Sequence, residues 1–455
     1  MRKYLTIILL TGFLTETFSQ GTGGPLKLSL LQAQDYAIEN NNSVRTAKID
    51  VDIMAKQVKE AIAYGLPQLS VAANYQHQFV IPEFSFGAYL DPNALPDEGF
   101  LTKNDILDAY KQSPTVPLGV PDNTNIDFTL SQLIFSGEYL VGLQASRVVR
   151  QMTEKTLIRT IDVTKETVSN SYFMVLILGE SSKVLKESLT TMDKTYNESV
   201  KMNEQGFNEE TDVDQIKVSK SNLERLIASI EAQRDISVKL LKFQMGMEFS
   251  REIELTDSIP FLIDRGKMQY MTSPDYNVKQ SIDYQILNDQ VNVSSLLLKR
   301  AQSAWFPTIS GFYRRHEQTN QPQFNFAVKD LVGVSLNFPI FTSGQRTAKI
   351  SQARFSLEKT TANRNNAEQG LLLDFESALR AYQTAYNNFI TNSENIVLSK
   401  RIYQKSIIKF QEGVSTSFEL SQNQSQYLTS ESNYYNSVLT LLNAKAKLDR
   451  LLTIN

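Results

Sequence analysis

Two long stretches without proline constrain the fold of this chain more than any other feature of its sequence. One runs from Gly137 to Gly206 and the other from Gly344 to Gly413, and the two intervals have equal length. In the second stretch, apolar residues recur mostly at steps of three, four and seven, the spacing of helices that supercoil around neighbouring helices. At about 1.5 Å per residue, such a helix would reach ~100 Å. The sequence therefore predicts one elongated rod that is built twice.

Composition excludes several functional classes. The 455 residues carry a formal net charge of −3, which gives no basic face for a nucleic-acid partner. The chain has no cysteine, so disulfides, thiolate metal sites and cysteine nucleophiles are excluded. His77 and His316 lie on separate predicted strands and are interpreted as surface histidines, not metal ligands. Phosphate-binding glycine loops and the common hydrolase motifs are also absent, so we expect no enzyme activity, cofactor or metal.

The N-terminus has the pattern of an export signal. Arg2 and Lys3 precede a short apolar core at 5–14, and small or polar residues follow at 18–21. We therefore predict a signal peptide over residues 1–20. No later segment approaches the ~20 apolar residues of a membrane-spanning helix, so any membrane contact of the mature chain is expected to use strands.

Four segments alternate apolar and polar residues with the period of a β-strand. They cover about 68–79, 126–135, 308–316 and 331–340. Between the first two, residues 82–125 are rich in proline and are expected to form a long irregular loop of undetermined function. Four strands are too few to close a membrane barrel, so the chain is expected to oligomerise. Two copies would give 8 strands and a filled interior. Three copies would give 12 strands with a lumen, and we favour three.

The order of the predicted elements divides the chain into two structural repeats. The first covers 21–247, an inter-repeat equatorial segment covers 248–276, and the second repeat covers 277–455. Each repeat reads as helix, strand, loop, strand, long helix, hairpin turn and return helix. The opening helix of the first repeat is expected over 29–63. The fold class is mixed: all-α coiled-coil helices plus membrane β-strands.

Short motifs in this order resemble the outer membrane efflux protein family, the TolC-like channels. They are Leu30-Gln32-Ala33, Gly-Leu-Pro-Gln-Leu at 65–69, the Phe-Ser-Gly and Phe-Thr-Ser-Gly junctions ending at Gly137 and Gly344, and the two hairpin tips. The resemblance implies a homotrimer with a 12-stranded barrel in outer-membrane lipid and a 12-helix tunnel through the periplasm. It also implies two partners, a periplasmic adaptor protein and an inner-membrane pump.

The resemblance also directs attention to the hairpin tips. Asp212 aligns with the family's acidic position at the first tip, and Glu419 and Gln422 align with two acidic positions at the second. Ser415 and Phe410 occupy the positions of the basic and tyrosine residues that latch the closed state in TolC. The first tip is the more acidic, through Glu209, Glu210, Asp212 and Asp214. By resemblance, Asp212 and Glu419 would ring the periplasmic entrance and hold it shut.

The same tip residues have a structural explanation. Thr211 with Asp214, and Thr416 with Glu419, have the spacing of capping boxes that begin the return helices. Gly206 and Gly413 allow the chain to reverse. Whether the tip acids gate a pore or only cap helices stays open at the level of sequence.

The sequence thus favours a passive, gated exit duct of a tripartite efflux system in a Gram-negative outer membrane, extending into the periplasm. One alternative is the exit component of a type I protein secretion system. Another is an exported coiled-coil scaffold or adhesin without a pore. The sequence does not identify the cargo or the pump.

Overall fold

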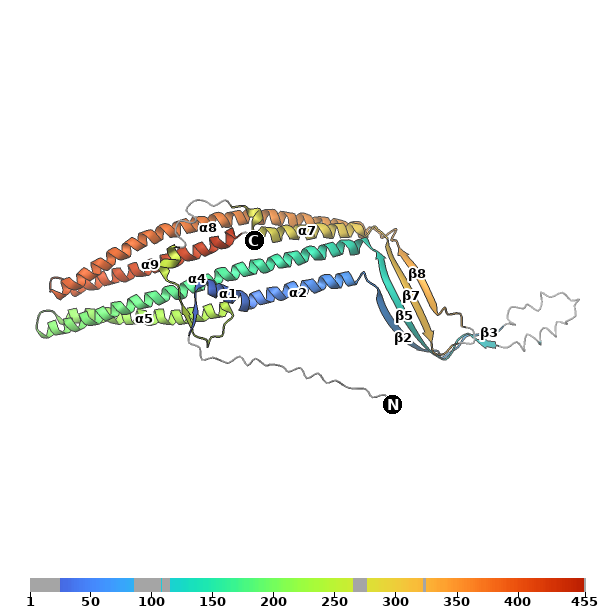
Figure 1. Ribbon diagram of the computed structural model, residues 1–455, viewed down its shortest axis with the longest axis horizontal. Coiled ribbons are helices and arrows are strands. Elements are labelled where there is room, and N and C mark those ends of the chain that lie inside the picture. The colour runs from blue at the N-terminus through green and yellow to red at the C-terminus, as the bar shows by residue number, and fades with distance from the viewer. Residues whose placement is uncertain (1–24, 86–107, 109–114, 265–275, 322–324, 454–455) are drawn as a thin grey trace, which may run out of the picture. The chain divides into compact units, whose positions relative to one another are not determined.

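The computed structural model describes residues 25–85, 108, 115–264, 276–321 and 325–453 (Figure 1). The predicted signal peptide, most of the 82–125 region and residues 265–275 of the inter-repeat segment lie outside these ranges. The described chain is mostly helical. Its longest elements are α4 (Gly137–Glu204) and α8 (Gln345–Gln411). No helix within the described ranges combines the length and apolar character needed to cross a bilayer.

The chain divides into two compact units, and α4 and α8 each contribute to both. The sheet unit comprises the described parts of 46–159 and 277–372. The hairpin unit comprises the described parts of 25–45, 160–276 and 373–453.

The sheet unit is built on a four-stranded antiparallel sheet with the order β2-β5-β7-β8. The strands are β2 (Gln68–His77), β5 (Asp122–Phe135), β7 (Thr308–Gln318) and β8 (Asp330–Asn337). The central β5–β7 pairing joins the two repeats, with Asp127 directly opposite His316. The outer edges of β2 and β8 have no partner strand within the described chain.

One face of this sheet is apolar and exposed. Val71 lies opposite Phe128, and Ile309 lies opposite Leu336, because every second residue of a strand points to the same side. Val332 and Val334 of β8 are 76% and 70% exposed. The other face is polar, and on it His316 Nδ1 lies 2.8 Å from Asp127 Oδ1. A row of exposed apolar side chains of this length is unusual on a surface that faces water.

The bounds of the described strands differ from those expected. β2 ends two residues earlier than expected, β8 three residues earlier, and β5 begins four residues earlier. The 82–125 region is also not irregular at its described ends. There β3 (Glu83–Ser85) pairs antiparallel with β4 (Thr115–Pro117). This pairing joins segments about 30 positions apart, so local alternation could not reveal it.

In the sheet unit, shorter helices run beside the first parts of the long ones. These are α2 (Asn42–Ala63) and α7 (Ile282–Ser303). Lys155 of α4 binds Asp289 of α7 at 2.6 Å, and Ser294 of α7 binds Thr360 of α8 at 3.2 Å. Asp289 is buried, so its pairing satisfies a charge that would otherwise be costly to desolvate.

The helix expected over 29–63 is two helices, and that expectation was wrong at Asn41. α1 (Leu30–Asn40) begins with a capping box between Ser29 and Gln32. Asn41 then leaves helical geometry. Its side chain accepts from Ser43 N at 2.7 Å and donates to Gln244 O at 2.5 Å. The break thus depends on a contact with a segment some 200 residues away, which helical periodicity does not record.

In the hairpin unit, the described part of the inter-repeat segment joins the N-terminal strand. β6 (Ile253–Leu255) pairs in parallel with β1 (Leu26–Leu28), and α6 (Ile259–Asp264) follows. Asp257 Oδ2 accepts from Leu30 N at 2.7 Å and from the buried Tyr172 hydroxyl at 3.0 Å. One carboxylate therefore ties the start of α1 and the inter-repeat segment to α4.

The core of the hairpin unit lies among the long helices and the return helices α5 (Glu210–Met245) and α9 (Ser417–Leu452). Tyr172 and Tyr382 are among its fully buried side chains. Ion pairs tie neighbouring helices along its length: Glu166–Arg450 at 2.6 Å, Asp374–Lys447 at 2.6 Å and Asp193–Lys220 at 2.7 Å.

Candidate functional site: the two hairpin tips

The two hairpin turns have the same backbone. Gly206 follows α4 with φ of 78°, and Gly413 follows α8 with φ of 71°. In both turns the glycine N–H and the next N–H bond back to the last turn of the helix. Phe207 N bonds to Met202 O at 2.8 Å, and Val414 N bonds to Lys409 O at 2.9 Å. Left-handed φ angles and these return bonds define a glycine-ended helix, so both glycines are required by the backbone.

The two return helices begin with different caps. At the second tip Thr416 is the N-cap, and its Oγ1 accepts from Glu419 N at 3.2 Å, as the expected box requires. The reciprocal arm is absent, because the Glu419 carboxylate accepts from Ser415 Oγ at 2.9 Å instead. Glu419 is therefore held within its own tip.

At the first tip the expected frame of the capping box was wrong. α5 begins at Glu210 with Glu209 as N-cap, and Glu209 N donates to Asp212 Oδ2 at 3.3 Å. Thr211 donates to Glu209 Oε2 at 3.2 Å and does not cap the helix. The box is shifted by two positions from Thr211–Asp214 to Glu209–Asp212. Both pairs have the same spacing, so spacing alone did not distinguish them.

Asp212 also connects the two tips. Its Oδ1 accepts from the hydroxyl of Ser417, a buried residue in the first turn of α9. One turn further along, Ser219 and Ser421 are hydrogen bonded at 2.9 Å. Asp212 thus serves both the start of its own helix and the contact between α5 and α9. It does not meet Glu419 within this chain.

The remaining predicted tip residues have separate environments. Glu210, Asp214 and Gln422 are exposed. Phe410, at the position of the latch tyrosine, is 3% exposed and belongs to a buried cluster beneath the turns. Its ring is therefore part of the packing of α8. The cluster consists of Met192, Ile216, Tyr403, Phe410, Leu420 and Tyr427.

Several contacts that shape the tips could not be predicted from charge or periodicity. Ser417 is one of them. Another is Asn208, whose Nδ2 donates to Ser199 Oγ at 2.9 Å. Gln411 Nε2 donates to Glu198 Oε2 at 2.7 Å and so joins the ends of α8 and α4. These residues are small or neutral. Ser417 and Gln411 find their partners only where the two hairpins meet, and Asn208 finds its partner across its own turn.

The tips also expose large apolar side chains. Phe207, Val414 and Phe418 are 75%, 72% and 64% exposed. Each lies within a few residues of a turn glycine or of the first turn of a return helix. Both tips therefore present apolar side chains next to carboxylates.

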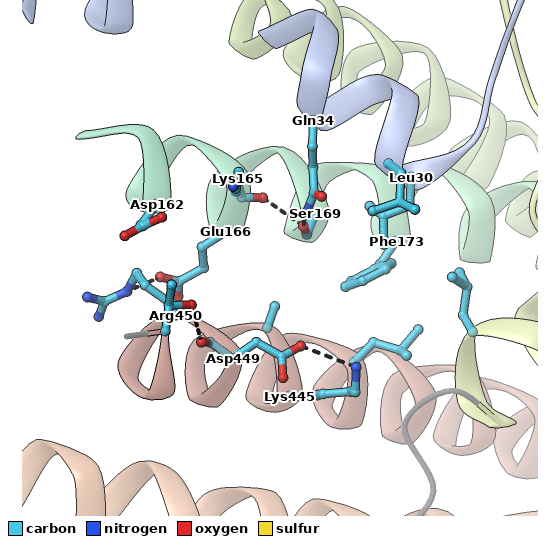
Figure 2. Close-up of a pocket in the computed structure, with 15 residues that line it drawn as sticks. Leu30, Gln34, Asp162, Lys165, Glu166, Ser169, Phe173, Lys445, Asp449 and Arg450 are labelled. Carbon is cyan, nitrogen blue, oxygen red and sulfur yellow. Dashed lines mark hydrogen bonds and ion pairs between the residues drawn. The ribbon is translucent and has the colours of Figure 1, made fainter. Parts of the chain in front are cut away.

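A cavity of about 440 Å³ lies elsewhere in the hairpin unit, between α4 and α9 and beside α1 (Figure 2). Its charged walls are largely paired with each other. Glu166 binds Arg450 at 2.6 Å across the cavity, and Lys445 binds Asp449 at 3.2 Å along α9. This pairing fits a structural contact between helices better than a catalytic site. Among the described residues, no group of three or more histidine or acidic side chains is placed to hold a metal ion.

The comparisons with known proteins agree with the fold described above. The model of the family "Outer membrane efflux protein" matches residues 290–453. No curated protein matches the chain. This match confirms the family resemblance noted in the sequence over residues 290–453, and it agrees with the expected location in the outer membrane.

Several solved structures share the fold. Crystal structures of CusC superpose with a TM-score of 0.75 at 14% identity, covering 94% of this chain and 92% of that one. The Campylobacter jejuni CmeC outer membrane channel gives a TM-score of 0.71 at 15% identity, with coverage of 93% and 85%. The outer membrane protein VceC from Vibrio cholerae gives 0.70 at 14%, with coverage of 93% and 95%.

Proposed function

Since residues 290–453 match the outer membrane efflux proteins and the chain has the fold of outer-membrane channels, we propose that it is a passive exit duct of a tripartite efflux system. In this proposal three copies form the duct. A periplasmic adaptor and an inner-membrane pump supply the energy and the cargo. The chain itself contributes a gated, water-filled path.

The observation that carries this proposal is the four-stranded sheet with one apolar exposed face and two unpaired edges. In lipid, each unpaired backbone group costs several kcal/mol, so the edges of β2 and β8 need partners. Three copies joined edge to edge would make a closed 12-stranded barrel. Its apolar face would meet lipid, and its polar face would line a lumen.

The hairpin tips are the proposed periplasmic entrance. The exposed Phe207, Val414 and Phe418 offer an apolar surface for the adaptor. Asp212 and Glu419, repeated three times, would place carboxylates around the opening. In the present conformation both acids accept hydrogen bonds from serines, Asp212 from Ser417 and Glu419 from Ser415. Holding the entrance shut would therefore involve the Asp212–Ser417 bond between the two tips of each chain.

Single-channel recording of the detergent-purified protein in a planar bilayer tests this proposal. We expect discrete conductance steps from the wild type. Replacing both acids, Asp212→Ala with Glu419→Ala, should raise conductance or lower cation selectivity, because the tie is lost and the carboxylates no longer attract cations. Glu394→Ala is the control, since Glu394 is an exposed carboxylate of α8 far along the chain from the turn.

Three outcomes would count against the proposal or a part of it. A protein that is extracted from membranes without detergent and gives no conductance would be a coiled-coil scaffold or adhesin. Unchanged conductance and selectivity in the double variant, with only a lower melting temperature, would restrict Asp212 and Glu419 to capping. Peptide conduction in place of small-molecule conduction would assign the duct to type I protein secretion.

A further inference from the structure

A carboxyl group without a partner lies inside the helical hairpins. Glu431 of α9 is 2% exposed, and neither of its carboxylate oxygens has a hydrogen-bond partner among the described residues. Two further buried polar atoms of the α8–α9 hairpin, Tyr403 Oη and Gln424 Nε2, also have no hydrogen-bond partner within the described chain. An ionised carboxylate in such surroundings loses its hydration without compensation. The site therefore suits a neutral, protonated side chain.

The charges around Glu431 are few and oppose each other. Lys400 of α8 favours the ionised form, whereas Glu187 of α4 favours the neutral form. Both are exposed, so solvent weakens their influence. On its own helix Glu431 lies one turn from Tyr427 and from Tyr435, whose phenols are neutral at these pH values, and burial raises the pKa of both further. Burial dominates at Glu431 as well and raises its pKa from 4.5 to about 7.

Buried side chains of α8 and α9 extend from Glu431 toward the hairpin tips. Tyr427, one helical turn closer to the tip, stacks on Tyr403 of α8 with ring centroids 5.5 Å apart and planes at 12°. Both rings belong to the buried cluster that contains Phe410 and Leu420. Water admitted at Glu431 would therefore reach the packing that supports the second tip.

We propose that Glu431 is a proton-binding site that controls the packing of the α8–α9 hairpin. The protonated side chain lets α4, α8 and α9 close around it. Release of the proton to solvent leaves a charge that needs water, and the hairpin loosens near Tyr403 and Tyr427 to admit it. This proposal goes beyond the exit-duct function and does not depend on conduction.

The direction of the pH effect follows from proton binding. Between pH 4.5 and about 7, the packed protein holds a proton that the opened or unfolded chain has released. The packed state is therefore favoured at low pH and loses stability as pH rises to about 7, after which the loss is complete. Loosening should therefore be absent below about pH 4.5, increase as pH rises, and be greatest above about pH 7.

Hydrogen exchange of the full chain in detergent tests the proposal, with wild type and Glu431→Gln compared at the same pH. Glutamine has nearly the same shape and stays neutral. At about pH 8.5, peptides covering 400–431 should exchange at least several-fold faster in the wild type than in the variant, and at about pH 4, where the opened chain also keeps the proton, the two should agree. Glu394→Gln, at an exposed carboxylate of the same hairpin, should behave as the wild type at both values. Equal exchange of wild type and Glu431→Gln at both values would overturn the proposal.

A second measurement covers the case in which Glu431→Gln does not fold. Infrared difference spectroscopy of the wild type should show a protonated carboxyl band that disappears as pH rises through about 7. Lys400→Gln should move that transition to higher pH, and Glu187→Gln should move it to lower pH. Absence of the band at about pH 6, or shifts that do not have these opposite signs, would show that Glu431 does not hold the proton.

Discussion

The two junctions between sheet and long helix can be compared directly, because each brings the start of a long helix against the end of a shorter one. At the first, the Tyr139 hydroxyl donates to Ile62 O, near the end of α2, at 3.1 Å. At the second, Arg346 Nη1 donates to Ala304 O, just after α7, at 3.3 Å. Carbonyls at helix ends need a donor from outside the helix. Ile62 O also accepts from Gly65 N at 3.1 Å, so the Tyr139 hydroxyl is its second donor. The two repeats thus place different side chains against equivalent carbonyls.

The two hairpins likewise share their backbone geometry at the turns and differ elsewhere. Gly206 and Gly413 have matching φ angles and matching return bonds. The return helices, however, end differently: α5 ends at Gly246 with φ of 70°, whereas α9 ends at Thr453 in an extended conformation. The repeats agree where the chain must reverse within a few residues, and they differ where the next segment leaves in another direction.

The largest expected effect concerns glycines at two of these points. A Cβ at Gly246 would lie 2.2 Å from Asn40 O, whereas a Cβ at Gly206 would meet nothing within 4 Å. Both positions have positive φ. Gly206→Ala should therefore cost about 1 kcal/mol from backbone strain alone. Gly246→Ala adds a backbone clash and should cost at least ~3 kcal/mol. Urea unfolding of the detergent-purified protein measures both.

The comparison between these two glycines is informative in either direction. If both variants lost the same free energy of unfolding, the α1–α5 contact at Asn40 and Gly246 would not restrict the chain. Glycine would then be needed at position 246 only because φ is positive there, as it is at the tips.

The second prediction separates the two junctions. Arg346 is 6% exposed and donates to Ala304 O, to Thr342 Oγ1 and to Pro339 O, and its guanidinium lies 4.2 Å from the centre of the Trp305 ring. Arg346→Met keeps the aliphatic stem but leaves these acceptors unpaired, and should lower the free energy of unfolding by about 2–3 kcal/mol.

Tyr139→Phe is the matched change at the first junction. It removes one hydroxyl donor and keeps the ring, so it should cost about 1 kcal/mol. A loss for Tyr139→Phe as large as that for Arg346→Met would mean that the two junctions depend equally on one carbonyl. The additional bonds of Arg346 would then contribute nothing measurable.

The sequence predicted those features that leave a repeating or paired mark along the chain. The alternation at Val332, Val334 and Leu336 indicated a strand, and equal intervals indicated the long helices and their turn glycines. These features are local, because a strand face or a helical turn is decided by residues a few positions apart.

The missed features depend on contacts between distant segments. Asn41 ends α1 because its side chain reaches Gln244 and its neighbours in the turn, and a helical pattern continues through it. Ser417 became part of the site only because α5 and α9 begin side by side, which brings it to Asp212. Neither residue has a charge or a motif that marks it in advance.

The smallest predicted effect compares the two caps. Thr416 Oγ1 accepts from Glu419 N at 3.2 Å, so Thr416→Ala should cost about 1 kcal/mol of helix-start stability. At the first tip the bond between Glu209 N and Asp212 Oδ2 uses the backbone of Glu209, which Glu209→Ala retains. That variant loses the contact with Thr211 and should cost only a few tenths of a kcal/mol, as exposed polar contacts do.

Both cap variants can be measured by urea unfolding, and Asp212→Ala completes the comparison. If Asp212 supplies both the cap and the link to Ser417, its loss should exceed that of Glu209→Ala and approach that of Thr416→Ala. A loss for Glu209→Ala that matched Thr416→Ala would instead assign the cap to the Glu209 side chain. Asp212 would then be left with the link to Ser417 alone, and its role at the tip would be the joining of the two repeats.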